Sequence, residues 1–259
     1  MDRGTTIVSM VSGQATFPEQ ALDWLVPEAK AGILALDVAS SQTVRRFSRR
    51  GHNFVLVDPN AAALAKARAR LPGVTLVCAT AGKLPIPSCA FEAVLLTSAN
   101  ADLAAKPVLS ELARVLLPGG MLVIQIVMRD DSVPWVRRLA EIVRRADPQA
   151  MSTSSQVANV EAIVSSPNFR IRETRDFRLW VPMRKANLLD QVRTNTAVSA
   201  LPESTQTNLV EDVGHLYDSV ARVGEPLRLP YKIACWRAEV VHLTPDRPWR
   251  DTSSLSITL

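Results

Sequence analysis

The sequence predicts an α/β protein in which a largely parallel sheet is covered by helices on both faces. Short apolar segments that suit buried strands alternate with segments that suit helices. Near the middle of the chain, Pro118, Gly119 and Gly120 separate an amphipathic helix from the next apolar strand. Proline cannot continue a helix, and glycine tolerates the positive φ needed just past a helix end. Strand–helix–strand units of this kind build parallel sheets with helices on both faces.

The first half of the chain contains five expected strands and the helices between them. The strands are expected at 33–38, 53–57, 74–78, 93–97 and 121–127. The helices are expected at 18–26, 43–50, 61–70 and in a segment that ends at 117. Gly51 and the pair Pro72–Gly73 mark two of the helix ends. In a parallel sheet of this kind, the ligand cleft lies at the carboxyl ends of the strands.

The pattern changes beyond residue 127. Helices are expected at 132–146, 156–165, 185–200 and 202–223. Two further β-rich segments are expected at 169–181 and 229–243. The residues up to 14 are expected to be loose, and residues 244–259 form a polar, proline-containing segment expected to be an irregular tail.

Composition excludes several classes of function. No apolar run reaches the ~18 residues of a membrane span. The net charge is +5, but the arginines are spread over helices that also have apolar sides, and aromatic residues are only 5% of the chain. This pattern favours solvated helix faces over a nucleic-acid surface. We see no signal peptide, and the three scattered cysteines indicate a reducing, cytoplasmic setting, with Cys78 and Cys235 expected in the core.

The chain lacks several well-known motifs of metal sites, nucleotide-binding sites and hydrolases. His52, His215 and His242 are far apart and have no metal-ligand spacing, so no metal site is expected. His52 follows a helix end, where a capping role is expected, and His215 and Tyr217 are expected at partly exposed helix positions. The chain has no P-loop, no GxSxG elbow and no GxGxxG after the first strand.

Several passages resemble the class I S-adenosylmethionine (SAM) methyltransferases of the type 11 family. Residues 111–120 (ELARVLLPGG) resemble the end of that family's core domain, and residues 84–94 (LPIPSCAFEAV) match its LPxP…FDxV passage. Residues 129–136, 201–203 and 229–231 resemble landmarks of the branch that includes ubiquinone-biosynthesis and trans-aconitate methyltransferases. The resemblance covers nearly the whole chain.

The resemblance implies a Rossmann-like, doubly wound sheet of seven strands, in which the last strand pair is antiparallel. It further implies one methyltransferase-like domain over residues 1–243. Within it, residues 18–128 would form the core that holds SAM, and residues 129–243 would add helices and antiparallel strands as a lid or a dimer surface.

The family's first strand normally ends in an acid followed by GxGxG. Here Asp37 supplies the acid, but Ala39, Ser41 and Thr43 stand at the three glycine positions. Glycine allows unusual φ values there and lets the backbone approach the cofactor closely. The resemblance therefore implies SAM as cofactor, with Asp37, Ala39 and Ser41 at its site, and the replaced glycines imply weak binding.

The second, third and fourth strands supply the remaining candidate residues. Asp58 follows the second strand, where a carboxylate can accept both ribose hydroxyls; capping of the next helix is the alternative. Thr80 replaces the acid that would meet the adenine amino group, and Ala81 follows it. Thr97 follows the fourth strand, where relatives often carry a histidine and an aromatic residue that this chain lacks. The sequence names no catalytic residue.

Two functions remain open. One is a SAM-dependent methyltransferase that acts on a small-molecule or lipid-like acceptor, since methyl transfer depends mainly on positioning. The other is a catalytically inactive relative that keeps the fold to bind a protein partner or to assemble, including as a homodimer. The retained acids Asp37 and Asp58 favour the enzyme, and the lost glycines favour the inactive relative.

Overall fold

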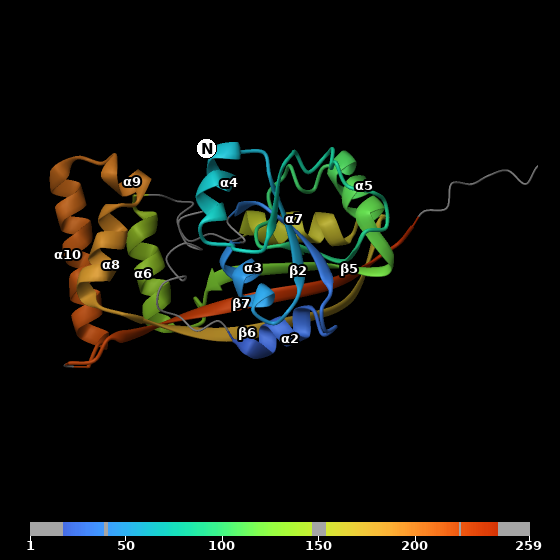
Figure 1. Ribbon diagram of the computed structural model, residues 1–259. Coiled ribbons are helices and arrows are strands. Elements are labelled where there is room, and N and C mark those ends of the chain that lie inside the picture. The colour runs from blue at the N-terminus through green and yellow to red at the C-terminus, as the bar shows by residue number, and fades with distance from the viewer. Residues whose placement is uncertain (1–17, 39–40, 147–153, 223, 243–259) are drawn as a thin grey trace, which may run out of the picture.

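A computed structural model describes residues 18–38, 41–146, 154–222 and 224–242. Its seven strands form one sheet in the order β3-β2-β1-β4-β5-β7-β6 (Figure 1). The strands are β1 (Gly32–Leu36), β2 (Asn53–Asp58), β3 (Thr75–Cys78), β4 (Phe91–Leu96), β5 (Leu116–Arg129), β6 (Phe169–Met183) and β7 (Leu227–Val240). Neighbours among the first five are parallel, and β7 is antiparallel to both β5 and β6. The predicted seven-stranded sheet with an antiparallel last pair is confirmed.

Two clusters of apolar side chains cover the two faces of the sheet. The first cluster joins alternate residues of the strands to α2 (Glu19–Leu25), α3 (Ser41–Ser48), α4 (Ala61–Arg68) and α6 (Pro134–Arg144). The second joins the other strand residues to α5 (Lys106–Val115) and α7 (Ser154–Val164). Because successive strand residues point to opposite faces, one sheet can support both clusters.

Three helices follow β6 and build the end of the molecule beyond the sheet. These are α8 (Lys185–Arg193), α9 (Thr196–Ser199) and α10 (Glu203–Val220), and α10 packs against both α8 and α6. Figure 1 shows them with α6 at one end of the molecule, beside the arrowhead of β5. The helix expected over residues 185–200 is therefore two helices. It is interrupted because the Asn195 side chain accepts hydrogen bonds from the N–H groups of Ala197 and Val198, which caps a new helix.

The junction between α5 and β5 differs in detail from the expectation. The helix ends at Val115, not at 117, and Leu116 already pairs with Phe91 of β4. The N–H groups of Cys89 and Ala90 donate to the carbonyls of Arg114 and Val115, so the last carbonyls of the helix bond the chain that enters β4. Gly119 has a φ of +78°, in the left-handed region, within the irregular segment before Met121 resumes the pairing.

Three expectations about single side chains are wrong. Cys78 is exposed, because it ends the edge strand β3, whereas Cys235 is buried as expected. Tyr217 is buried, because its hydroxyl reaches the ends of β6 and β7. The hydroxyl donates to the Met183 carbonyl and accepts from the Leu227 N–H. His215, on the same helix, is exposed. The His52 ring packs against Phe47, with a centroid separation of 5.4 Å, and only its backbone N–H bonds the helix end.

Candidate functional site

Polar residues lie together at the carboxyl ends of the parallel strands. Six polar or charged residues are buried in the described chain, and His52 alone among them lies away from this edge: the others are Thr43, Asp58, Thr97, Gln125 and Asp130. Burial of polar groups is costly unless they are paired, so their concentration at one edge requires a reason. This edge is also where the cleft of an open α/β sheet lies.

Two polar residues of this edge share one face of the sheet. Asp58 and Gln125 lie on the same side of β2 and β5 as the strand residues of the first apolar cluster. Because strand side chains alternate with a period of two, both belong to the face covered by α2 and α3. Asp37 and Thr97 directly follow β1 and β4 at the same edge.

Asp58 joins the ends of the first two strands. Its Oδ2 accepts the Val38 N–H at 2.9 Å, and its Oδ1 accepts the Asn60 N–H at 2.7 Å. The helix cap is Asn60, whose side chain accepts the Ala63 N–H, so Asp58 does not cap α4 itself. A carboxylate has about four acceptor positions, which leaves two for the hydroxyls of a ligand.

Asp37 adopts a left-handed backbone conformation, with φ of 69°. Its N–H donates to the Val57 carbonyl at 2.9 Å, which holds it beside the end of β2. Non-glycine residues in this region are uncommon, but aspartate adopts it more readily than most, and Lys30 and Cys89 share it elsewhere in the described chain. Among the other residues of the predicted loop, Ala39 lies outside the described residues, and Ser41 begins α3 without a described side chain. Thr43 is buried in the first turn of α3.

The loop after β3 is held beside the same edge. The Ala79 N–H donates to the Asp58 carbonyl at 3.3 Å, which places the start of the loop next to the end of β2. Thr80 is exposed and Ala81 half-buried. Thr80 and Ala81 directly follow Ala79, so this backbone hydrogen bond holds the start of their loop beside Asp58. Thr97 lies further away, because β1 separates the end of β4 from the end of β2.

An ion pair on α5 fixes the rest of this loop. Glu111 accepts the Leu84 N–H at 2.9 Å, and Arg114 donates to the carbonyls of Ile86 and Leu84. Arg114 and Glu111 also bond each other at 2.7 Å. The hydrogen bond from Arg114 lowers the pKa of Glu111 below its ordinary value, and the same bond raises the pKa of Arg114. The loop is therefore ordered without a helix of its own.

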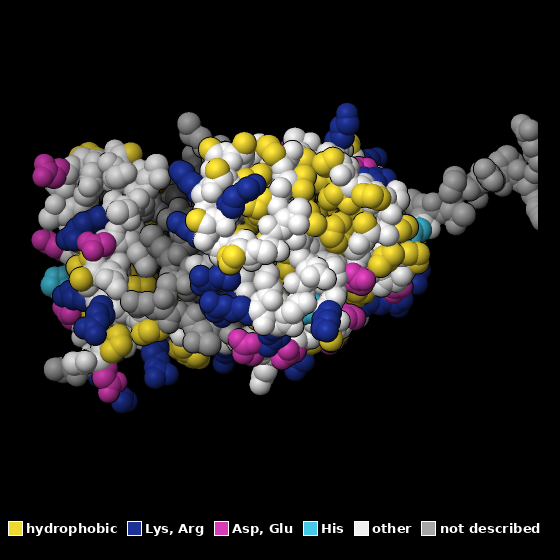
Figure 2. All heavy atoms as spheres, viewed as in Figure 1, with side chains coloured by type: hydrophobic (Ala, Val, Ile, Leu, Met, Phe, Trp, Pro, Cys, Tyr) yellow, Lys and Arg dark blue, Asp and Glu magenta, His cyan; other side chains and the backbone are white. Residues whose placement is uncertain are grey.

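Figure 2 shows hydrophobic side chains gathered on the surface between α4 and α5. Val77, Ala79, Ala81, Ile86 and Val108, from β3, the following loop and α5, are only half-buried and pack on the second apolar cluster. A partly exposed apolar surface next to Asp58 can cover the flat face of an aromatic ring.

Sequence reasoning missed Gln125. Its side chain is 3% exposed, and its Oε1 has no hydrogen-bond partner among the described residues. The available signal was the amide that interrupts the apolar run MLVIQIV of β5. β4 pairs with β5 as far as Leu96 opposite Ile124, so Gln125 comes next, where Thr97 leaves the sheet. Two uncharged polar residues therefore follow the last paired residues of β4 and β5, near the middle of the edge.

The sequence analysis included Asp130 only within residues 129–136, which resemble a passage of the family. It directly follows β5, its Oδ1 accepts from the Ser132 N–H and hydroxyl, and its N–H donates to the Pro230 carbonyl. Arg178 of β6 lies 3.6 Å from its other oxygen. These contacts connect the end of β5 to β6, to β7 and to the turn that precedes α6, which assigns Asp130 a structural task.

The described residues contain no group of three or more His, Cys, Asp or Glu side chains that could hold a metal ion. No helix among the same residues is long and apolar enough to cross a membrane.

Comparisons with known proteins agree with this geometry. Residues 36–124, from the end of β1 to β5, match the family described as methyltransferase domain. An uncharacterized methyltransferase of Mycobacterium tuberculosis is 28% identical over 238 residues, which cover 91% of this chain and 94% of the relative. One from Schizosaccharomyces pombe is 20% identical, over 88% of this chain and 92% of the relative.

Solved structures show the same fold. A putative type II methyltransferase from Anaeromyxobacter dehalogenans superposes with a TM-score of 0.66 at 18% identity, over 88% of this chain and 97% of that one. A putative methyltransferase from Bacillus halodurans superposes with a TM-score of 0.53 at 14% identity, over 92% and 99%. The seven-stranded sheet with its antiparallel last pair is the fold that these proteins share.

Proposed function

We propose that this chain, which belongs to the class I methyltransferases, binds SAM at the carboxyl edge of its sheet and methylates a small-molecule or lipid-like acceptor. The observation that carries the proposal is the buried Asp58 carboxylate, whose two backbone hydrogen bonds leave acceptor positions for a pair of hydroxyls. Asp58 closes the end of β2, where the Asp37 N–H bonds the Val57 carbonyl, in the segment that matches the methyltransferase domain.

The other predicted residues complete this proposed site. We assign the ribose hydroxyls to Asp58 and the adenine ring to the apolar surface that includes Ala79 and Ala81, with the Thr80 hydroxyl accepting from the adenine amino group. Asp37, Ala39, Ser41 and Thr97 would then surround the remainder of the cofactor. Residues 18–128 form the cofactor core in this proposal, and residues 129–243 cover the acceptor.

When bound, SAM would supply a methyl group attached to a positively charged sulfur, and the sulfur would depart as a neutral thioether when the methyl carbon bonds to the acceptor. The chain's own task is to hold the acceptor in line and to exclude water. Thr97 and Gln125 lie where β4 ends beside β5, and both offer uncharged oxygen atoms as hydrogen-bond acceptors. Neither is a strong base, so catalysis here rests on positioning.

The inactive relative remains the second candidate, because a specific observation favours it. Thr43, at the third glycine position of the family motif, is buried in the first turn of α3. A β-branched side chain there occupies space that a glycine would leave open. In this alternative the loop is closed around its own side chains, and function would lie at a partner surface.

The test is isothermal titration of SAM and S-adenosylhomocysteine into the wild type, Asp58→Ala and Glu141→Ala. Loss of the Asp58 carboxylate should weaken binding by about 1.5–3 kcal/mol, the range for hydrogen bonds that involve a charged group. Glu141 is exposed on α6, so its variant should bind as the wild type does. Asp58→Asn keeps the shape of the side chain, and thermal midpoints verify that each variant is folded. Equal affinity in all variants would refute the assigned site.

A further inference from the structure

The outer side of β6 is an edge of the sheet. This strand ends the row of seven, and β7 is the strand of the described chain with which it pairs. In Figure 1, β6 lies along the border of the sheet, below β7. A strand at an edge presents a row of backbone N–H and C=O groups that another strand can bond. β6 has fifteen residues, whereas β3 at the other edge has four, so the row on β6 is long.

Most side chains of this edge strand are exposed. Residues 170–176 are all exposed. Three large hydrophobic side chains are exposed in the described chain, and two of them, Ile171 at 46% and Trp180 at 47%, lie on β6. Single exposed apolar residues are common, but these two accompany the long edge. The edge therefore combines backbone groups available for pairing with apolar surface that a neighbour could cover.

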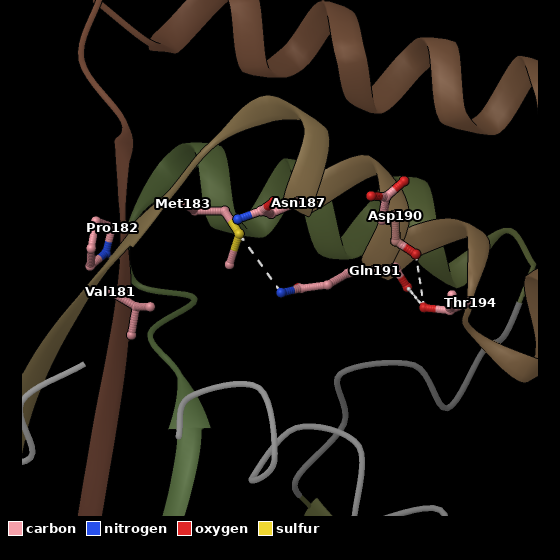
Figure 3. A pocket seen from close by; sticks show the side chains of 7 residues that line it. All are labelled: Val181, Pro182, Met183, Asn187, Asp190, Gln191 and Thr194. Carbon is pink, nitrogen blue, oxygen red and sulfur yellow. Dashed lines mark hydrogen bonds between the residues drawn. The ribbon is translucent and has the colours of Figure 1, made fainter. Parts of the chain in front are cut away.

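Alternation assigns the side chains of β6 to two faces of the sheet. The end of the strand contributes four side chains to the first apolar cluster: Phe177, Leu179, Val181 and Met183. The even-numbered positions from 174 to 182 therefore point to the opposite face. Figure 3 shows this at the strand end, where Met183 lies on the side of α8 and Pro182 on the other side. The register with β7 shifts between Ile171 and Glu173, so the regular alternation covers residues 173–183.

The charges of β6 are complementary to those of a second copy. A two-fold axis makes a strand run antiparallel to its own copy, and residues equally far from the axis then lie opposite each other on the same face. An axis at Arg175, Asp176 or Arg178 would set two like charges directly against each other. An axis at Phe177 sets Asp176 of each copy opposite Arg178 of the other. Opposite charges at such positions stabilise a strand pair, and like charges destabilise it.

The alternative axes are less favourable. An axis at Thr174 also opposes unlike charges, Glu173 and Arg175, but it brings the register shift of both copies next to the axis. Axes nearer to Met183 shorten the paired stretch, because the strand ends there. The axis at Phe177 keeps residues 173–181 of both copies opposite each other, within the regular part of the strand.

The neighbours of Asp176 and Arg178 extend the match. Asp176 pairs with Lys232 of β7 at 2.7 Å, and Arg178 lies 3.6 Å from Asp130. The Asp176 side chain is nonetheless 56% exposed and that of Arg178 73%, so both can reach across the edge. Across the axis, Lys232 and Asp176 of one copy would join Arg178 and Asp130 of the other in a line of alternating charges. Such a network contributes more than isolated surface pairs do.

We infer that the chain forms a two-fold dimer in which the two β6 strands pair antiparallel about Phe177, so that the two sheets become one. Each copy bonds the outer backbone groups of the other, and Trp180 packs opposite Thr174. The charges on this edge repel a strand that lacks acids at the matching places, which favours pairing with a second copy. β5 and β7 separate β6 from the strands that carry Asp37, Asp58 and Thr97, so the inference does not depend on the proposed function.

Sedimentation velocity over a series of protein concentrations tests the dimer. The wild type should sediment as a dimer that dissociates on dilution. Asp176→Arg sets positive charges against each other at both cross-strand pairs, and Arg178→Asp sets negative charges against each other. Each change should raise the dimer dissociation constant at least about tenfold. Glu211→Arg, at an exposed position of α10, is the matched control and should leave the constant unchanged.

The two single variants should then dimerise with each other. In the mixed pair, one copy has arginine at both positions and the other has aspartate at both, so both cross-strand pairs attract again. The mixture should form a dimer at least about fivefold more tightly than either variant alone, which also shows that both are folded. A wild type that stays monomeric at every concentration, a dimer that survives both charge reversals, or a mixture no tighter than its components would overturn the inference.

Discussion

Asp58 and Cys78 are register partners at the ends of β2 and β3, and the Cys78 thiol is directed at the Pro59 carbonyl, 3.5 Å away. The carboxylate proposed to bind the ribose, Asp58, therefore lies beside an exposed thiol, Cys78. A second exposed thiol, Cys89, lies on the far side of the β3–β4 loop, where its N–H bonds the end of α5. The chain thus carries a reporter of the site and an internal control.

We expect saturating SAM to slow alkylation of Cys78 by iodoacetamide at least about threefold and to leave Cys89 unaffected, because a ligand at Asp58 would cover the neighbouring sulfur. Peptide mass spectrometry after timed labelling measures both rates. Cys235 should stay unlabelled until the protein unfolds, because burial, with a contribution from Asp176, raises the pKa of its thiol to about 12. Equal slowing of Cys78 and Cys89 would point to a general effect on the fold.

Restoring the glycines of the first loop should strengthen cofactor binding. Ala39→Gly with Ser41→Gly removes two Cβ groups at positions where the family motif has glycine, and we expect at least about a tenfold gain in SAM affinity, equivalent to ~1.4 kcal/mol. Wild-type binding should be near millimolar. A control pair, Ala162→Gly with Ser110→Gly on exposed positions of α7 and α5, should bind as the wild type does.

Isothermal titration of these three proteins decides between the two candidate functions. Micromolar binding by the wild type would defeat the inactive-relative alternative. Failure of both the wild type and the loop variant to bind would mean that the loop is closed around its own side chains, and the function would then lie at a partner surface.

Gly120→Ala should destabilise the protein by about 1–3 kcal/mol, the cost of overpacking a rigid site. An added Cβ would lie 2.8 Å from the Leu117 carbonyl oxygen and 3.2 Å from that of Glu92, and both are backbone atoms. The matched control is Gly82→Ala, whose Cβ would meet only the Val108 side chain at 3.7 Å; we expect its effect to stay within about 0.5 kcal/mol. Urea unfolding measures both, and similar values for the two would contradict the close approach at Gly120.

His52 should make folding less favourable in acid. Burial, followed by the nearby Arg50, lowers the pKa of its imidazole below the ordinary 6.5. The unfolded chain therefore takes up this proton at a higher pH than the folded chain does. The contribution of His52 to stability is then full above the unfolded pKa and declines as the pH falls below it.

The comparison is urea unfolding at pH 7.5 and 5.5 of the wild type, His52→Leu and His215→Gln. The leucine variant should lose less free energy of unfolding between the two pH values than the wild type does. His215 is exposed, so its variant should follow the wild type. A pH dependence unchanged in His52→Leu would exclude the imidazole as its source.

The order of strands and helices could be predicted because alternating apolar segments and glycine or proline stops are local signals. Burial of single residues depended on neighbours that the sequence does not reveal. Cys78 lies in an apolar segment, but β3 is an edge strand with only β2 beside it. Tyr217 was expected at a partly exposed helix position, but its hydroxyl bonds two strand ends, at Leu227 ten residues away along the chain and at Met183 thirty-four residues away.

The candidate site divides in the same way. Asp37, Asp58 and Thr97 could be named because each ends a recognisable strand, and the structure places them at one edge. Gln125 was not singled out in the sequence, because its place beside Thr97 depends on where the neighbouring strand β4 stops.

The position of β7 has a consequence for synthesis of the chain. β7 is the last of the seven strands to leave the ribosome, yet it lies inside the sheet, between β5 and β6. Until β7 is made, β5 has an open edge and β6 has no strand to pair with. β6 begins at residue 169 and β7 at residue 227, so this state lasts while the residues between them are synthesised. Open strand edges are where nascent chains associate wrongly. Assembly of the sheet therefore finishes with the insertion of β7 between two strands that precede it in the chain.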